Sequence, residues 1–364
     1  MWKLKKKVLP RPPEVTTGKK DNEGRLITNP DKLKSLILNH FVDRLKHREM
    51  LPHLKKLQFL REEILSFRLE NTKLNTSPEW SMKDLENVLK KLKNGKSRDP
   101  AGLVNEIFKL DNIGTDLKES ILILMNKIKT EMEEPDFMED ANIVTIFKGK
   151  GSRSDLINDR GIFLLNILRT IKDKLIHEDI KDVLDKNMSD SQVGSRKEKG
   201  IRNHLFIAHS VINHAKQTKS NIDITLYDLR QCFDGLWLEE CLNDLYENGI
   251  KDDKLNMIFR GNQNNNVSVK LPIGESERVP IKNVVTQGGP LGVSLCSVTV
   301  DTIGKEALDA TNNETNDEEY IYKYHDAKIP PLSMVDDLLT VSKCGPESIM
   351  TNAFVLTSPI EAQL

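Results

Sequence analysis

An Asp-Asp doublet inside an otherwise apolar stretch is the feature that most constrains how this chain can fold. Asp336 and Asp337 separate two short apolar runs in KIPPLSMVDDLLTVS, and Asp228 ends the alternating apolar segment at 221–229. Adjacent carboxylates between strands repel each other unless a cation lies between them. A hairpin turn explains the doublet, and a strand ending at Asp228 can supply a third carboxylate. The structural alternative is a polar turn and an Asp cap.

Three converging carboxylates predict a particular chemistry. Carboxylate oxygens are the ligands that hard cations such as Mg²⁺ prefer. Two such ions support phosphoryl transfer, in which one activates an attacking hydroxyl and the other neutralises the leaving pyrophosphate. The acids therefore indicate a candidate two-metal site.

The charge distribution bears on possible partners. The formal net charge of -1 argues against a nucleic-acid partner, but residues 1–60 contain 15 Lys/Arg against 6 Asp/Glu, whereas residues 301–364 contain 4 against 12. A basic front and an acidic back fit phosphate contact at one end and metal ligation at the other; solvated faces are the alternative. The sequence contains no run of about 18 apolar residues, so no membrane span is predicted. Four scattered cysteines favour a reduced intracellular compartment. The expected location is the nucleus and/or the cytoplasm.

Hydrophobic periodicity predicts a mixture of helices and strands, which places the fold in the α+β class. A β-hairpin is expected around Gly274. Helices are expected over 31–69 with a break at Pro52, from the Ser81 cap to Asn94-Gly95, and over 116–132, 162–186 and 202–219. Strands are expected at 142–148 and 221–229.

Three sequence blocks follow one another along the chain, and the first and third of them contain these acids. They read YDLRQCFDGLW, TQGGPLGVSLCS and MVDDLLTVS. In this order the blocks resemble the D-x-x-x-A-F-D, Q-G-x-P-L and aromatic-Ala-Asp-Asp motifs of reverse transcriptases, specifically those of non-LTR (LINE-type) retrotransposons. Upstream, GKSRDPAGLVNEIFK, IVTIFKGKGSRSDLINDRGIFLLN and SDSQVGSRKEKG resemble further segments of the same family. The resemblance covers roughly residues 80–358.

The resemblance implies a right-hand polymerase fold with fingers and palm, and an antiparallel palm sheet packed on helices. It implies an RNA-directed DNA polymerase that adds dNTPs to a primer 3′-hydroxyl, with an RNA template and a DNA primer as partners. Two Mg²⁺ ions, or Mn²⁺, would be held by Asp228, Asp336 and Asp337, with the backbone carbonyl of Leu229 as an extra ligand.

The same resemblance assigns substrate-binding roles. Arg160 would clamp the incoming triphosphate with Lys148, for which Lys150 is the alternative; an exposed basic loop is the structural reading of these cations. Phe233 would be the steric gate that excludes a 2′-hydroxyl, unless it is only a core residue. Gln287 and Gly288 would support the nucleotide and the template base.

Asp234 matches a family position, and a helix N-terminal cap explains it equally well. Five positions depart from the family pattern: Met334 and Val335 before the doublet, Gly161 for proline, Ser195 for phenylalanine and Thr286 for a basic residue. These departures favour a divergent lineage or relaxed selection.

The expected organisation is a basic helical extension over 1–80, fingers over 81–220 and an incomplete palm over 221–364. Because the thumb is expected to be missing, weak or no processive synthesis is expected. Two rival functions remain open. One is a non-catalytic nucleic-acid-binding remnant of such an enzyme, and the other is a different palm enzyme, either maturase-like or an RNA-templated RNA polymerase.

Overall fold

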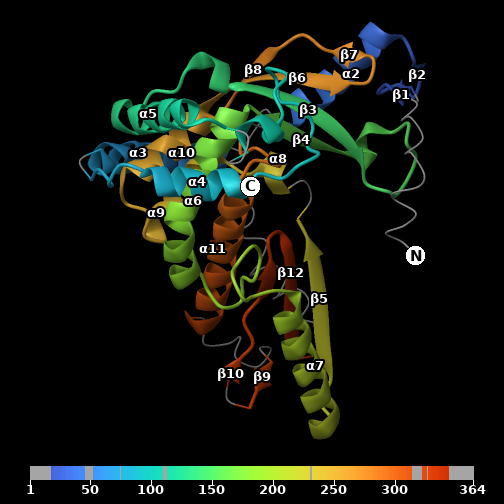
Figure 1. The fold of residues 1–364 in the computed structure, drawn as a ribbon. Helices are drawn as coiled ribbons and strands as arrows, with labels where there is room; N and C mark the ends of the chain where they lie inside the picture. The colour runs from blue at the N-terminus through green and yellow to red at the C-terminus, as the bar shows by residue number, and fades with distance from the viewer. Residues whose placement is uncertain are drawn as a thin grey trace, which may run out of the picture.

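Figure 1 shows the fold of the chain in a computed structural model, which describes residues 18–45, 52–73, 75–109, 113–229, 232–313, 322–325 and 327–343. The helices are α2 Pro30–Leu45, α3 Pro52–Thr72, α4 Met82–Lys90, α5 Thr115–Glu131, α6 Ile167–Asn187, α7 Ile201–Thr218, α8 Cys232–Gly235, α9 Leu238–Glu247, α10 Asp253–Gln263 and α11 Gly292–Asn313. The short 3₁₀ helices are η1 Asn105–Phe108, η2 Asp136–Met138 and η3 Leu156–Asn158.

The strands are β1 Lys19–Lys20, β2 Leu26–Ile27, β3 Asp140–Phe147, β4 Asp159–Leu165, β5 Ile222–Asp228, β6 Asn264–Leu271, β7 Gly274–Glu275, β8 Val279–Lys282, β9 Lys323–Tyr324, β10 Ala327–Lys328, β11 Leu332–Met334 and β12 Asp337–Lys343. Helices and strands are mixed along the chain, so the predicted α+β class is confirmed. In the part of the chain described, no helix is both long enough and apolar enough to cross a bilayer.

The first sheet joins distant parts of the sequence. Among the described strands its order is β4-β3-β6-β7, with β8 also paired to β6. β3 runs antiparallel to β4 and parallel to β6. Helix α2 packs against this sheet through Phe41, which shares a buried cluster with Ile143 and Phe163. The sheet thus spans two predicted regions, the fingers and the palm, and their boundary at residue 220 stays a prediction.

The predicted helix over 162–186 is wrong in its first turn. Residues 159–165 form β4, in which burial alternates along the strand, and the helix begins only at Ile167. The apolar run GIFLL fits a helix or a strand equally well, because a short run carries no decisive period. Pairing with β3 decides for the strand, and the Asn166 side chain caps α6 by accepting from the Leu168 N–H at 2.8 Å.

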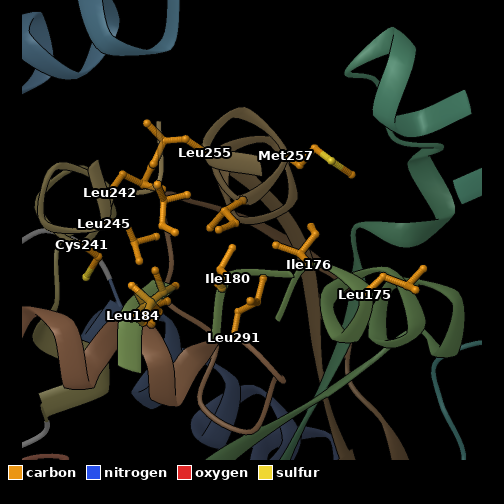
Figure 2. Close-up of a cluster of buried hydrophobic side chains, with 14 of the residues drawn as sticks. Leu175, Ile176, Ile180, Leu184, Cys241, Leu242, Leu245, Leu255, Met257 and Leu291 are labelled. Carbon is orange, nitrogen blue, oxygen red and sulfur yellow. The ribbon is translucent and has the colours of Figure 1, made fainter. Parts of the chain in front are cut away.

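The largest core lies between helices. Figure 2 shows side chains of α6, α9 and α10 that meet beside Leu291, the residue directly before α11. Leu175, Ile176, Leu242 and Leu255 are each at most 1% exposed. Burial of such side chains contributes about 1.5–3 kcal/mol each. This core holds α11 in place, and α11 in turn supports the second sheet.

The second sheet carries the predicted acids. In the described residues its order is β11-β12-β5, antiparallel throughout, as predicted for a palm sheet. Leu338 joins the large helical core, whereas Val341 packs with Val211 and Ala215 of α7. Because side chains alternate along a strand, the two faces of β12 pack on different helices. In Figure 1, α7 accordingly runs beside β5.

Candidate active site

The three predicted acids come together at one end of the β11-β12-β5 sheet. Asp337 begins β12 and faces Asp228, the last residue of β5, as its pairing partner. Val335 and Asp336 form the tight turn between β11 and β12. The hairpin and the neighbouring strand predicted from the sequence are both present. The chain thus presents two carboxylates side by side and a third in the adjoining turn.

The acids open onto a cavity of about 250 Å³. Among its lining residues are most of those predicted from the sequence; the lining comprises Arg44, Lys148, Ile157, Arg160, Asp228, Leu229, Cys232, Phe233, Asp234, Gln287 and Asp336. Asp337 and Gly288 lie next to lining residues without being lining residues themselves. The cavity therefore brings cations from the first sheet opposite acids of the second.

Electrostatic effects show that the acids are close. Burial raises the pKa of Asp336, the negative charges of Asp337 and Asp228 raise it further, and Arg160 lowers it. Like charges disfavour ionisation of a neighbouring carboxyl, so this site stabilises positive charge.

The cations come from the β3–β4 hairpin. The Lys148 Nζ donates to the carbonyl of Ile157 at 2.9 Å, which holds its side chain across the hairpin. Burial lowers the pKa of Lys148, as do Arg44 and Arg160. Lys148, and not Lys150, lines the cavity. The Arg160 side chain is exposed at the cavity wall, so its planar fork is accessible to an anion.

Arg44 is a further cation of the cavity, and its place there was not predicted from the sequence. It lies in the last turn of α2 and forms an ion pair with Asp234, with each side chain 12% exposed. Burial raises the pKa of Asp234, and Arg44 lowers it. Asp234 lies inside α8, so the alternative of a helix cap is wrong. No motif marks Arg44; its position in a basic helix was the available signal.

Phe233 and Gln287 lie where α8 and the start of α11 approach each other. The Phe233 ring is half-buried and packs against the large core. The Gln287 carbonyl accepts from the Phe163 N–H at 2.8 Å, which fixes the turn before α11 against β4. Gly288 follows with a φ of +104°, and a Cβ there would lie 2.8 Å from the Ile162 side chain. The glycine is thus required by backbone geometry.

The donor set fits a divalent metal ion in its chemistry. Asp228, Asp336 and Asp337 carry carboxylate oxygens and Leu229 carries a backbone carbonyl, which are the kinds of ligand that Mg²⁺ takes in proteins. Asp228, Leu229 and Asp336 line the cavity. Over the described ranges, however, no three His, Cys, Asp or Glu side chains form a ready ligand group. The fit is therefore one of donor chemistry.

Comparison with known families decides what this site belongs to. A family model described as reverse transcriptase (RNA-dependent DNA polymerase) matches residues 150–348, more than half of the chain. The chain belongs to the reverse transcriptase family. The matched range contains the three acids, Arg160 and Phe233, whereas Lys148 and Arg44 lie outside it.

Membership gives the activity at the level of the family. The reverse transcriptase is an RNA-directed DNA polymerase, a nucleotidyltransferase whose substrates are dNTPs and whose partner is a nucleic-acid template. Reverse transcriptases use divalent metal ions. The palm and fingers implied by the family agree with the two sheets that meet at the cavity.

Proposed function

We propose that the cavity between the β3–β4 hairpin and the β11–β12 turn is where this reverse transcriptase joins a dNTP to a primer 3′-hydroxyl. The observation that carries the proposal is the placement of Lys148 and Arg160 on the same cavity as Asp228 and Asp336. A triphosphate between them would meet cations at its phosphate end. The acids would lie at the α-phosphate, where the new bond forms.

Two Mg²⁺ ions, or Mn²⁺, would be held by Asp228, Asp336 and Asp337 with the Leu229 carbonyl. When bound, such ions lower the pKa of the attacking hydroxyl and offset charge on the leaving pyrophosphate. The protein contributes the rigid base for these ligands, because β5 and β12 fix Asp228 and Asp337 in register. A site on strands is held more firmly than one on loops.

Three residues of the cavity region would select and orient the nucleotide. Phe233 would lie under the sugar and exclude a 2′-hydroxyl, since its ring is held by the core from below. Gln287 would contact the nucleotide from the turn before α11, and Gly288 lets that turn lie close to β4. The substrate would thus be a deoxynucleotide.

The lineage we propose is that of non-LTR (LINE-type) retrotransposons. The support is the order of sequence blocks from GKSRDPAGL at 95–103 through MVDDLLTVS at 334–342. Such an enzyme would copy an RNA template from a DNA primer inside the cell, in the nucleus or the cytoplasm.

Replacement of Arg160 by alanine tests the assignment of the triphosphate end. Loss of a hydrogen-bonded charge costs about 1.5–3 kcal/mol, which corresponds to a drop of about 10- to 100-fold in kcat/KM for the dNTP. Arg153→Ala is the matched control. Arg153 is an exposed arginine of the same hairpin that stacks on Phe147 and does not line the cavity.

Steady-state single-nucleotide incorporation on an RNA-templated primer measures both variants. We expect Arg160→Ala to raise KM for the dNTP strongly, and Arg153→Ala to stay near the parent enzyme. Equal effects of the two substitutions would show that only the net charge of the hairpin matters, and the assignment would fail.

A further inference from the structure

The segment between α6 and α7 pairs with the strand that leads into the catalytic turn. The Ser333 N–H donates to the Ser191 carbonyl at 2.8 Å, and the Val193 N–H donates to the Ser333 carbonyl at 2.9 Å. Gln192 therefore lies beside Ser333 in a parallel bridge. Arg196 fixes the segment from the other side by donating to the Gln192 carbonyl at 2.9 Å.

The Gln192 side chain reaches from this segment into the turn itself. Its Oε1 accepts from the Val335 N–H at 3.0 Å and from the Gly194 N–H at 2.9 Å. Its Nε2 donates to the Val335 carbonyl at 3.3 Å and to the Ser297 carbonyl at 3.4 Å. The amide is fully buried, and all of its hydrogen-bonding positions are used. One side chain thus holds both backbone polar groups of Val335.

Val335 needs such support. Its φ is +63°, a conformation that costs a β-branched residue free energy and persists only where surrounding structure enforces it. Gly194 lies directly against the turn, because a Cβ there would lie 2.5 Å from the Val335 nitrogen. The residue after Val335 is Asp336, so the angle of this turn sets where the Asp336 carboxylate points.

We propose that Gln192 is a positioning residue for nucleotidyl transfer: it fixes the Val335–Asp336 turn and thereby aims the carboxylates of Asp336 and Asp337. This inference rests on the proposed function of those acids. Gln192 touches neither substrate nor ion in this account. It acts through the backbone of Val335, whose two hydrogen bonds to Gln192 hold the turn in a conformation that the turn sequence alone disfavours.

Gln192→Met is the decisive variant, because methionine keeps the length of the side chain and removes all four hydrogen bonds. Small misplacements of catalytic groups cost up to about 100-fold in rate. We expect kcat for single-nucleotide incorporation to fall about 10- to 100-fold, with KM for the dNTP within about threefold of the parent. Mn²⁺ binding, followed by electron paramagnetic resonance, should weaken in parallel.

Asn256→Leu is the matched control for stability. Asn256 is another buried amide, whose Nδ2 donates to the Leu69 carbonyl at 3.0 Å and to the Thr72 hydroxyl at 2.6 Å, remote from the cavity lining. It should lower the free energy of unfolding to a similar extent while leaving kcat and Mn²⁺ binding of the folded protein unchanged. Equal losses of kcat in both variants would overturn the proposal, because they would reflect stability alone.

Two further variants keep every outcome interpretable. If Gln192→Met does not fold, Gly194→Ala displaces the Val335 nitrogen directly and should show the same loss of kcat and of Mn²⁺ binding. Asp336→Asn is measured alongside. An active Asp336→Asn enzyme would refute the proposed site itself. Suppose instead that Asp336→Asn is inactive and Gln192→Met keeps the parental activity. That result would refute only the positioning role, and Gly194→Ala replaces Gln192→Met in this comparison if Gln192→Met does not fold.

Discussion

Replacing Gly288 by alanine is expected to destabilise the reverse transcriptase and to disturb the proposed nucleotide site. The backbone φ of +104° disfavours any side chain, at a cost of about 1–2 kcal/mol. In addition, the new Cβ would lie 2.8 Å from the Ile162 side chain and 3.1 Å from the Phe163 carbonyl. Overpacking of this kind costs about 1–3 kcal/mol. The expected total is about 2–5 kcal/mol.

Gly274 separates the two contributions. Its φ is +118°, yet a Cβ there would meet nothing within 4 Å. Gly274→Ala should therefore lose only about 1–2 kcal/mol, and the difference between the two variants measures the contact with β4. Relief of the clash in Gly288→Ala moves the turn that carries Gln287, so kcat/KM for the dNTP should also fall in that variant only.

Urea unfolding followed by tryptophan fluorescence gives the free energies of unfolding. A second change, Ile162→Ala, removes the side chain nearest to the new Cβ and should recover part of the loss in the Gly288→Ala background. Two results would refute the close packing of this turn on β4. One is that Gly288→Ala destabilises the protein no more than Gly274→Ala does. The other is that adding Ile162→Ala to Gly288→Ala lowers the free energy of unfolding by as much as Ile162→Ala does in the parent protein.

Three other predictions follow from the cavity and its surroundings. Phe233→Ala should raise rNTP use relative to dNTP use in primer extension, whereas an enzyme that already accepts rNTPs would show no change in that ratio. Arg44→Ala should raise KM for the dNTP about 3- to 30-fold through loss of a cation, while Asp234→Asn, which leaves Arg44 charged, should not; equal KM increases would mean that the ion pair is only structural. Burial lowers the pKa of His40 to about 4, so this side chain is neutral in the folded protein at neutral pH. The free energy of unfolding should therefore fall as the pH is lowered from 6.5 to 4, and it should fall less in His40→Gln.

The sequence predicted the acids and their hairpin because their signals are local. Alternating apolar residues define β5 and β12, and an acidic doublet between apolar runs indicates a turn. The range 162–165 was misassigned because its apolar residues fit either period, and only pairing with β3 selects the strand. Local pattern thus predicts elements well where the period is clear.

Two features of the site lay beyond any local pattern. Arg44 meets Asp234 across 190 residues of sequence, and Gln192 meets Val335 across 143. Such contacts depend on how the sheets and helices pack against each other. The spacing of residues along a single sequence does not reveal that packing. The segment SDSQVGSRKEKG was visible as a resemblance. Its contact with the Val335–Asp336 turn becomes evident only when β11 and the α6–α7 segment lie side by side.

The role of the paired acids is tested most directly by single-nucleotide incorporation on an RNA-templated DNA primer. The 364-residue chain is compared with Asp228→Asn and Asp337→Asn, each at matched concentration of folded protein and with Mg²⁺ or chelator. We expect incorporation by the parent chain only when the divalent ion is present, and background levels of incorporation by both variants. Incorporation by either variant at the parental rate would contradict the claim that the paired ends of β5 and β12 form the active site.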